Sequence, residues 1–536
     1  MHLIGLLGMV VLVGLAWAMS YHRTQFPMRT VAWGLGLQFL FALIVLRNDA
    51  WSFVGMAVFA VLLLSYILGR GGVGPVEVAA TIAAVAAGAA GIAATSPGAL
   101  APAVGVLLVL LLLNARFRVL PKVQGPVGSL VVTLGLAWMV VNGVHGRELF
   151  AAFSERVAYF LSLSDYGSRF LFGNLVERQY FFTGEGAAWP GFGFQFAFKV
   201  LPTIIFFGGF MGVLYHLGIM QRVIEAMARF MRWTVRTSGS ETLSCTANVF
   251  VGQTEAPLLI KPFLDGLTKS ELLTVMVGGF ATIAGGVMAG YIAMGIPAAH
   301  IIAASVMAAP AALVLGKVVF PEQEHSQTAG DVKLPEIDVG GNVIEAAANG
   351  ITDGLKLAIN VAAMLIGFIA LLAVVDVLLG FLDGIVDGRL LGGAWVSYSS
   401  GGMSPAAGEF AGLFPGSLQT LFGSLLRPLA WLMGVPWSDA ALVGNLLGIK
   451  ISLNEFVAYS SLSGYIQSGA LSQRSVIIAT YALCGFANFS SIGIQIGGIS
   501  ALAPDRKGDL ARLGLKAMLA GAIASCLNAT IAGMLL

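Results

Sequence analysis

Charged side chains are scarce in this sequence. Lysine, arginine, aspartate and glutamate make up 10% of the 536 residues, while 57% are hydrophobic. A soluble domain needs a far more polar surface than this composition supplies, so a soluble globular protein is excluded. The chain also lacks any basic run, and we expect no nucleic-acid partner.

Cysteine is rare as well. Its three copies, Cys245, Cys484 and Cys526, are widely separated, which excludes a cysteine metal site and a disulfide framework. We expect them to be small packing residues. No side chains are arranged as a nucleophile–base pair or a catalytic metal cluster, so the sequence predicts a protein that is not an enzyme.

Long apolar windows are what the chain does have. About 20 apolar residues cross a hydrocarbon layer about 30 Å thick, and these runs are continuous, unlike the alternating strands of a β-barrel. The sequence therefore predicts an all-α polytopic membrane protein. The expected spans lie near 3–19, 29–46, 51–69, 76–95, 99–114, 127–144, 196–219, 272–295, 300–320, 354–383, 474–500 and 512–535.

Two further stretches are more polar than the spans. The charged and aromatic residues of 145–195 predict an interfacial amphipathic helix and a loop. The Pro and Gly residues of 405–437 favour an interfacial or buried segment over a span.

Lysine and arginine alternate along the expected connections. They follow the first, third, fifth and seventh spans, as Arg23, Arg70, Arg118 and Arg222 illustrate. Basic connections face the cytoplasm. We therefore expect the N-terminus and the C-terminus on the outer side of the cell (inner) membrane.

Two polar constellations interrupt the apolar pattern, and they resemble each other. The first is GQTEAPLLIKP (252–262) with GGFATIAGGVMAGY (278–291); the second is GIKISLNEFVAYS (448–460) with CGFANFSSIGIQIGG (484–498). Each holds one glutamate, Glu255 or Glu455, followed later by Gly-Phe-Ala and a polar residue. An odd number of expected spans separates them, which predicts inverted repeats with interrupted helices.

The segments before each glutamate are too short to cross the membrane and return. We expect two re-entrant hairpins, near 238–262 and 438–468, whose first helices are capped by Ser240 and Ser438. A carboxylate at the bilayer centre costs about 2.5–3.5 kcal/mol on insertion scales and is tolerated where it lines a watery cavity or meets a ligand.

The ligand class follows in part from the side chains nearby. Few cations accompany the glutamates, which disfavours an anionic ligand. The neighbouring Gln, Thr, Asn and Ser side chains suit a neutral ligand with hydroxyls and an amide-like edge. A nucleoside fits this chemistry, and a sugar or a neutral amino acid is not excluded by it.

The motifs resemble the signatures of the concentrative nucleoside transporter family, in its bacterial branch. GQTEAPLLIKP, GIKISLNEFVAY and CGFANFSSIGIQIGG look like three family motifs, and RTVAWGLGLQF near the N-terminus is similar too. The resemblance implies a homotrimer whose protomers each have eight spans, two re-entrant hairpins and two broken helices. The hairpin tips would meet at the substrate.

The resemblance also implies roles for single residues. The substrate-binding residues would be Gln253, Thr254 and Glu255 for the base, Glu455, Asn488 and Ser491 for the ribose, and Val287, Leu357 and Phe486 for the pocket lining. A sodium site would fall on the side chains of Asn248 and Thr282 and the carbonyls of Val251 and Ile283. Oxygen ligands at an unwound hairpin tip suit a hard cation.

Residues near 47–141 have no counterpart in the bacterial pattern. They hold four apolar spans, and an even number leaves the later spans in their original orientation. We therefore expect N-terminal transmembrane helices over 1–46, an inserted four-helix bundle over 47–144, an interfacial helix and loop over 145–195, and a transport core over 196–536.

The sequence as a whole predicts a secondary active symporter that imports nucleosides and is driven by a sodium gradient. The alternatives are a proton-coupled nucleoside symporter, with H⁺ as the coupling ion, and a nucleoside channel or sensor without coupling. An intramembrane enzyme is disfavoured because no catalytic group is in place. The expected partners are a nucleoside, the lipid bilayer and further copies of the chain.

Overall fold

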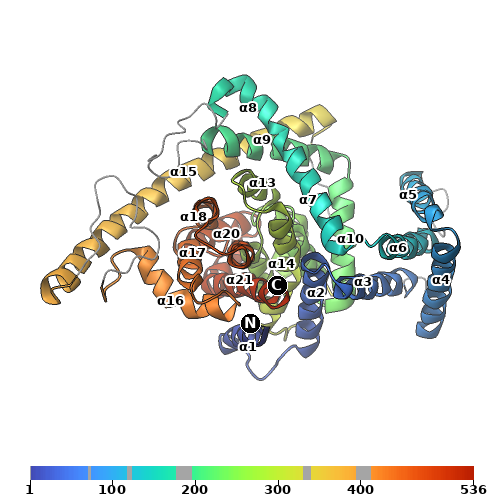
Figure 1. Ribbon diagram of the computed structural model, residues 1–536, viewed down its shortest axis with the longest axis horizontal. Helices are drawn as coiled ribbons and strands as arrows, with labels where there is room; N and C mark the ends of the chain where they lie inside the picture. The colour runs from blue at the N-terminus through green and yellow to red at the C-terminus, as the bar shows by residue number, and fades with distance from the viewer. Residues whose placement is uncertain (1, 70–73, 118–123, 177–195, 330–339, 394–411) are drawn as a thin grey trace. The chain divides into compact units, whose positions relative to one another are not determined.

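The computed structural model describes residues 2–69, 74–117, 124–176, 196–329, 340–393 and 412–536. These residues form helices and no strand. They divide into two compact units: a main unit of Met1–Gln38, Ser154–Met534 and Leu536, and a second unit of Phe39–Phe153 and Leu535. The helices α2 and α7 belong partly to each unit (Figure 1).

The helices follow the apolar windows of the sequence. Four of the α-helices lie wholly in the second unit and are described below. The other α-helices are α1 (His2–Ala18), α2 (Met28–Leu46), α7 (Gly146–Ser162), α8 (Ser164–Phe172), α9 (Phe196–His216), α10 (Ile219–Val235), α11 (Gly239–Ala247), α12 (Lys269–Ala281), α13 (Gly285–Ala293), α14 (Ala298–Val319), α15 (Val343–Asp383), α16 (Leu418–Leu432), α17 (Ala440–Ser452), α18 (Glu455–Ser468), α19 (Gln473–Leu483), α20 (Phe489–Ser500) and α21 (Lys507–Leu535).

Each predicted span coincides with a helix or with a pair of consecutive helices. Among the described residues, nine segments are long and apolar enough to cross a membrane. The helix α10 was not predicted, because its three arginines and its glutamate break the apolar run that identifies a span. The stretch 405–437 yields α16, and its residues up to 411 lie outside the described part of the chain.

The second unit contains α3 (Ala50–Gly69), α4 (Pro75–Thr95), α5 (Leu100–Phe117) and α6 (Gln124–Val141). Its buried centre consists of Ala89, Leu100 and Leu134. Elsewhere the side chains are apolar and exposed: Leu112 of α5, for example, is 68% exposed. An apolar helix with so little protein cover needs lipid around it. The predicted bundle over 47–144 lies inside this unit.

The segment predicted as hairpin 1 begins and ends on one buried ion-pair cluster. Its first arm is α11, where Lys317 of α14 lies 2.8 Å from Oε2 of Glu241. Its second arm is the 3₁₀ segment Ala256–Gly266, and just beyond it Thr268 donates to Glu322 at 2.9 Å. Lys317 also bonds Glu322, at 3.1 Å. Both arms therefore return to the same end of α14.

Hairpin 2 closes in the same way at its base. Its arms are α17 and α18, joined by Leu453 and Asn454. Asp439, directly before α17, accepts hydrogen bonds from the backbone N–H and the hydroxyl of Ser472, which follows α18, at 3.1 and 2.7 Å. Two residues of non-helical backbone thus form the tip between the arms.

The predicted helix caps need correction. The N-cap of α11 is Ser238 and not Ser240, because Glu241 reaches back to the Ser238 N–H at 2.8 Å. The N-cap of α17 is Asp439 and not Ser438, since the helix begins at Ala440. The predicted cap of α11 was therefore wrong by two residues, and the predicted cap of α17 was wrong by one.

Two helix pairs carry a break in the middle of the expected span. Residues 282–284 separate α12 from α13, and residues 484–488 separate α19 from α20. The two breaks contact each other, since the Phe486 N–H donates to the Thr282 carbonyl at 3.2 Å. Gly485 has φ +132°, and a Cβ there would lie 2.7 Å from the Phe280 carbonyl oxygen, so this approach requires glycine.

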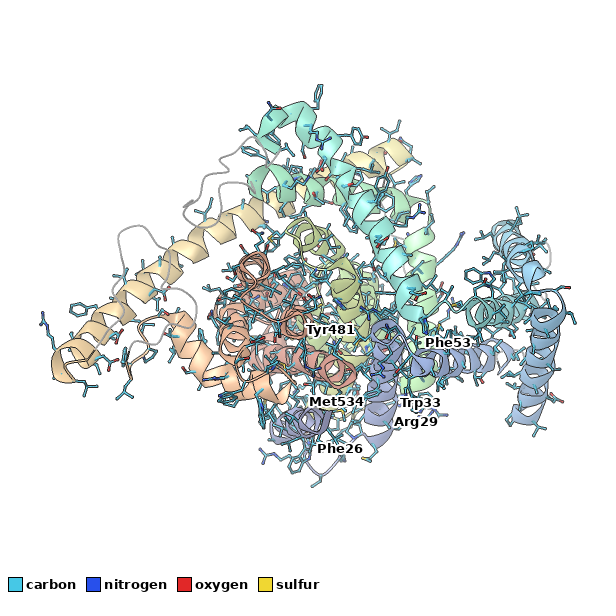
Figure 2. All side chains as sticks on the ribbon, in the orientation of Figure 1. Phe26, Arg29, Trp33, Phe53, Tyr481 and Met534 are labelled. Atoms are coloured by element: carbon cyan, nitrogen blue, oxygen red, sulfur yellow. The ribbon has the colours of Figure 1, made fainter. Side chains whose placement is uncertain are left out.

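The two ends of the main unit lie together. Gly5 of α1 packs against the Met534 side chain of α21, and Gly8 packs against Thr530. The two ends of the described chain therefore lie close together. Figure 2 draws the side chains on the ribbon and labels Tyr481 of α19. The Tyr481 side chain is fully buried.

Candidate functional site

The hairpin tips meet the helix breaks inside the main unit. At hairpin 1, the Phe250 carbonyl accepts from the N–H of Gly285, the first residue of α13, at 3.0 Å. At hairpin 2, Glu455 opens α18 directly after the tip and faces the second helix break. Four interruptions of regular helix therefore bring non-helical backbone and polar side chains into one region, which is typical of a transporter binding site.

The first polar group is centred on Glu455, which is 5% exposed. Its Oε1 accepts from the Tyr291 hydroxyl of α13 and its Oε2 accepts from Asn488 Nδ2, each at 3.1 Å. Asn488 is also the N-cap of α20, where its Oδ1 accepts from the Ser491 N–H at 2.9 Å. A carboxylate held by two donors at a helix N-terminus suits a ligand with hydroxyls.

The second polar group is a chain of amides and hydroxyls. Gln253 of the hairpin 1 tip donates to the Ser491 hydroxyl at 3.3 Å. Gln495 of α20 donates to Gln253 Oε1 at 3.0 Å. Thr254 packs against Gly498, where a Cβ would lie 2.8 Å from Thr254 Cγ2. Glu255 is exposed at the tip.

The predicted apolar lining comes from three different helices or breaks. Val287 of α13 is 3% exposed and Phe486 of the second break is 9% exposed. Leu357 of α15 is half-buried, and its Cδ2 would lie 3.8 Å from a Cβ on Gly286, next to Val287. Leu357 and Val287 therefore meet at the start of α13, and Phe486 lies two residues before Asn488. Their role as a lining for a flat ring stays a prediction.

The predicted sodium ligands lie at the first helix break and the hairpin 1 tip. Asn248 is 1% exposed, and its Oδ1 has no hydrogen-bond partner among the described residues, while its Nδ2 donates to Ser244 O at 3.0 Å. Thr282 is also buried and donates to Gly278 O at 2.7 Å, which leaves its hydroxyl oxygen free to accept. Val251 is half-buried and Ile283 is fully buried. A buried acceptor without a donor fits a cation ligand.

Two residues of the site were missed by sequence reasoning. Tyr291 ends the motif at 278–291, and Gln495 lies two helical turns beyond Asn488 in the motif at 484–498. The seven-residue spacing of Asn488 and Gln495 places both on one helix face, which is the signal that could have found Gln495. Tyr291 reads as a core aromatic, and only its contact with Glu455 distinguishes it.

Lys450, the cation nearest the second motif, is buried and donates to the Ala482 carbonyl at 2.9 Å. Ala482 lies in the last turn of α19, where a cation is favoured by the helix dipole. Lys450 thus stabilises the end of α19, directly before the second helix break.

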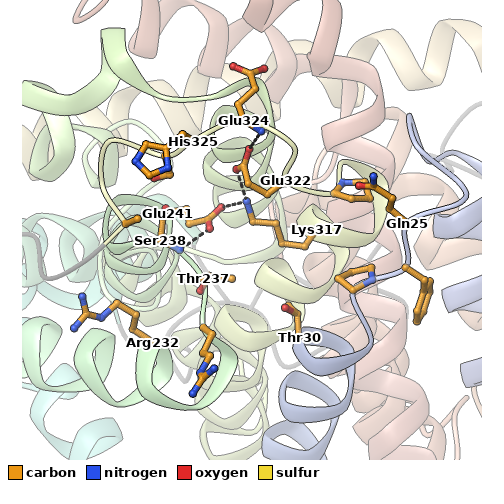
Figure 3. A pocket seen from close by; sticks show the side chains of 16 residues that line it. Gln25, Thr30, Arg232, Thr237, Ser238, Glu241, Lys317, Glu322, Glu324 and His325 are labelled. Atoms are coloured by element: carbon orange, nitrogen blue, oxygen red, sulfur yellow. Dashed lines mark hydrogen bonds and ion pairs between the residues drawn. The ribbon is translucent and has the colours of Figure 1, made fainter.

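The chain also has a cavity of about 680 Å³ away from the hairpin tips. Its lining comes from the start of α2, the ends of α10 and α14, the start of α11, and residues 321–329. Figure 3 shows Lys317 bonded to Glu241 and Glu322 in its wall. These three charged groups pair with one another, so their role is to anchor hairpin 1. The candidate binding site is therefore formed by the polar groups at the hairpin tips.

Three family models match the chain. They are described as the Na⁺ dependent nucleoside transporter C-terminus, over residues 300–533, nucleoside recognition, over 197–298, and the Na⁺ dependent nucleoside transporter N-terminus, over 7–70. The sequence is 42% identical over 414 residues to an uncharacterized transporter of Bacillus subtilis, YutK, covering 77% of this chain and 93% of that protein. The chain belongs to the sodium-dependent, or concentrative, nucleoside transporter family.

Other relatives agree with this assignment. The chain is 42% identical over 422 residues to sodium/nucleoside cotransporter 1 of Homo sapiens, covering 76% of this chain and 58% of that one. A solved structure described as CNTnw in an inward-facing substrate-bound state has 33% identity and a TM-score of 0.70, covering 99% of this chain and 98% of that chain.

Membership confirms several of the predictions. The chain is an all-α, multi-pass membrane protein of a nucleoside-transporting family, and it is a transporter and not an enzyme. The N-terminal family model reaches residue 70 and thus enters the segment predicted to be inserted. The inserted bundle, the inverted repeats and the assigned site residues stay predictions.

Proposed function

We propose that this transporter is a secondary active symporter that moves nucleosides into the cell across the inner membrane, together with sodium ions. The observation that carries the proposal is the pair of polar groups at the two hairpin tips, joined through Ser491 and Asn488 of α20. One group presents a carboxylate and the other an amide, and apolar side chains lie near both. A nucleoside has the same sequence of chemistries along its length: hydroxyls, a flat ring and an amide-like edge.

The ribose belongs at the carboxylate. Its hydroxyls would donate to Glu455 and contact Asn488 and Ser491, since a carboxylate is the strongest acceptor for two neighbouring hydroxyls. The base would then extend between Val287, Phe486 and Leu357 toward Gln253 and Thr254. Glu255, which is exposed at the tip, would assist through water.

Sodium would bind as a second substrate at the base of hairpin 1's tip. Asn248 Oδ1 is the buried acceptor that lacks a donor, and the Thr282 oxygen and the carbonyls of Val251 and Ile283 would complete an all-oxygen set. The ion would hold the tip against the first helix break. The Phe250 carbonyl joins the hairpin 1 tip to the first break, and the Thr282 carbonyl joins the two breaks. Ordering by the ion would therefore favour nucleoside binding, and the coupling would be reciprocal.

The orientation and the assembly belong to the same proposal. The contact of Gly5 with Met534 supports both termini on one side of the membrane. Because the basic connections favour the cytoplasmic side, the termini would lie on the opposite, outer side. A homotrimer is supported by α15, whose Val377 and Phe381 are 58% and 67% exposed and need lipid or another subunit against them.

The test is uptake into proteoliposomes. Labelled uridine and adenosine are supplied with an inward Na⁺ gradient, with K⁺ in its place, and with an inward proton gradient. Accumulation that requires Na⁺ supports the symporter, and accumulation that follows the proton gradient replaces sodium by H⁺. Equilibration without accumulation indicates a channel. Asn248→Ala should raise the Na⁺ concentration for half-maximal uptake about tenfold and leave the uridine KM at saturating Na⁺ within about threefold.

A further inference from the structure

The Gln253 side chain has one fixed orientation, and a second glutamine sets it. Gln495 of α20 is 1% exposed, and its Nε2 donates to two oxygens: the Met276 backbone carbonyl at 3.1 Å and Gln253 Oε1 at 3.0 Å. Gln253 is itself 8% exposed, and its Nε2 donates to the Ser491 hydroxyl at 3.3 Å.

The orientation follows from the backbone carbonyl. The oxygen and nitrogen of a side-chain amide have nearly the same shape, so hydrogen-bond partners must assign them. The Met276 carbonyl only accepts, so the Gln495 atom that faces it must be Nε2. That nitrogen only donates, so the Gln253 atom that faces it must be Oε1. Gln253 Nε2 gives one hydrogen to the Ser491 hydroxyl and keeps the other as the donor that it can offer to a ligand.

The packing holds the two glutamine side chains next to each other. Gly279 of α12 lies against the pair, and a Cβ at that position would lie 2.9 Å from Gln253 Cβ and 3.2 Å from Gln495 Cδ. The lack of a side chain at Gly279 is what lets two buried glutamines fit between α12 and α20. The hairpin 1 tip therefore presents a hydrogen-bond donor, while the hydroxyl of Thr254 beside it can donate or accept.

A fixed donor selects one class of base. With the ribose at Glu455, the atom of the base that reaches farthest toward hairpin 1 is the substituent on carbon 4 of a pyrimidine or carbon 6 of a purine. In uridine and inosine this substituent is a carbonyl oxygen, which accepts from Gln253 Nε2. In cytidine and adenosine it is an amino group, which would place one donor against another.

We infer that this transporter prefers nucleosides with a carbonyl at that position, in pyrimidines and purines alike, over those with an amino group, and that Gln495 is the positioning residue that sets the preference. The inference rests on the proposed function and on the base lying at Gln253. A site that hydrogen-bonds a substrate group discriminates against the analogue whose group cannot pair with it.

The first experiment uses the unmodified protein in proteoliposomes with an inward Na⁺ gradient. Initial uptake rates are measured at low concentration for uridine against cytidine and for inosine against adenosine. We expect uridine and inosine to be favoured about tenfold within each pair, because an unpaired buried donor costs about one hydrogen bond. Equal rates within both pairs overturn the inference and leave the proposed function standing. No uptake of any of the four nucleosides overturns the proposed function itself.

Two variants test the role of Gln495. Gln495→Met removes both donated hydrogen bonds, so the Gln253 amide can turn over, and the uridine-to-cytidine ratio should fall to about twofold or less while uridine uptake stays within about fivefold. In Gln495→Glu the new carboxylate can only accept, so it loses the hydrogen bond to the Met276 carbonyl, and Gln253 should turn Nε2 toward it. Gln253 then offers Oε1 to the base, which reverses the preference toward cytidine.

The matched control is Ser500→Ala, near the end of α20, whose hydroxyl bonds only Gly497 of its own helix at 3.4 Å. It should leave the ratio unchanged. Each variant is first shown to elute from a sizing column as the unmodified protein does. A tenfold ratio that persists in a well-folded Gln495→Met protein excludes Gln495 as the residue that sets base preference.

Discussion

Replacing Glu455 by glutamine tests the ribose end of the proposed site most directly. The carboxylate now satisfies two donors with two oxygens, Tyr291 on Oε1 and Asn488 on Oε2. A glutamine amide has one oxygen, so it cannot serve both donors as well. Asn488 cannot turn to compensate, because its own oxygen caps α20 through the Ser491 N–H at 2.9 Å.

The size of the effect follows from the lost charge. A hydrogen bond to an ionised acceptor contributes about 1.5–3 kcal/mol, and about 1.4 kcal/mol is a factor of ten. Uridine uptake at low concentration should therefore fall about tenfold to a hundredfold in Glu455→Gln. The matched variant Glu255→Gln changes a carboxylate of the exposed tip and should cost about threefold or less, because water screens that group.

The assay compares uridine with 2′,3′-dideoxyuridine, which keeps the base and the 5′ hydroxyl and lacks the 2′ and 3′ hydroxyls of the ribose. The unmodified protein should prefer uridine, and Glu455→Gln should remove most of that preference, because the missing interaction is the same one. A loss of equal size for both nucleosides would show that Glu455 acts on folding or on the transport cycle and not on the ribose. Surface expression and the sizing profile are measured for every variant.

Three further substitutions test the elements that hold the site. Lys317→Met leaves Glu241 buried without its partner and should destabilise the detergent-solubilised protein by about 3–5 kcal/mol, seen as a lower Tm, whereas adding Glu241→Gln should recover much of it. Asp439→Ala removes the acceptor of Ser472 at the base of hairpin 2 and should lower the Tm, with a smaller loss of stability of about 1–3 kcal/mol. An unchanged Tm would show that this contact does not stabilise the hairpin. Gly485→Ala forces a Cβ into the contact between the helix breaks and should abolish uptake, and a normal rate would show that the breaks do not need to touch.

The fold was largely predictable because membrane helices are recognised locally. An apolar run such as 300–320 has one stable outcome in lipid, and α14 occupies Ala298–Val319. The same reasoning missed α10, since a helix with three arginines is stabilised by one packed face that a window average cannot detect. The helix caps were shifted because Ser238, Ser240 and Glu241 offer competing local hydrogen bonds that only the built structure decides.

The sequence by itself determined that this is a multi-pass membrane protein, identified its family, and marked Glu455, Asn488 and Gln253 as polar residues out of place in an apolar chain. Those conclusions depend on composition and on short motifs. The tertiary structure alone decided which of these groups touch: Tyr291 and Glu455 are 164 residues apart, and Gln495 and Gln253 are 242 apart. A hydrogen bond depends on the distance and the angle between two groups in space, and the sequence between such distant partners does not directly specify either quantity.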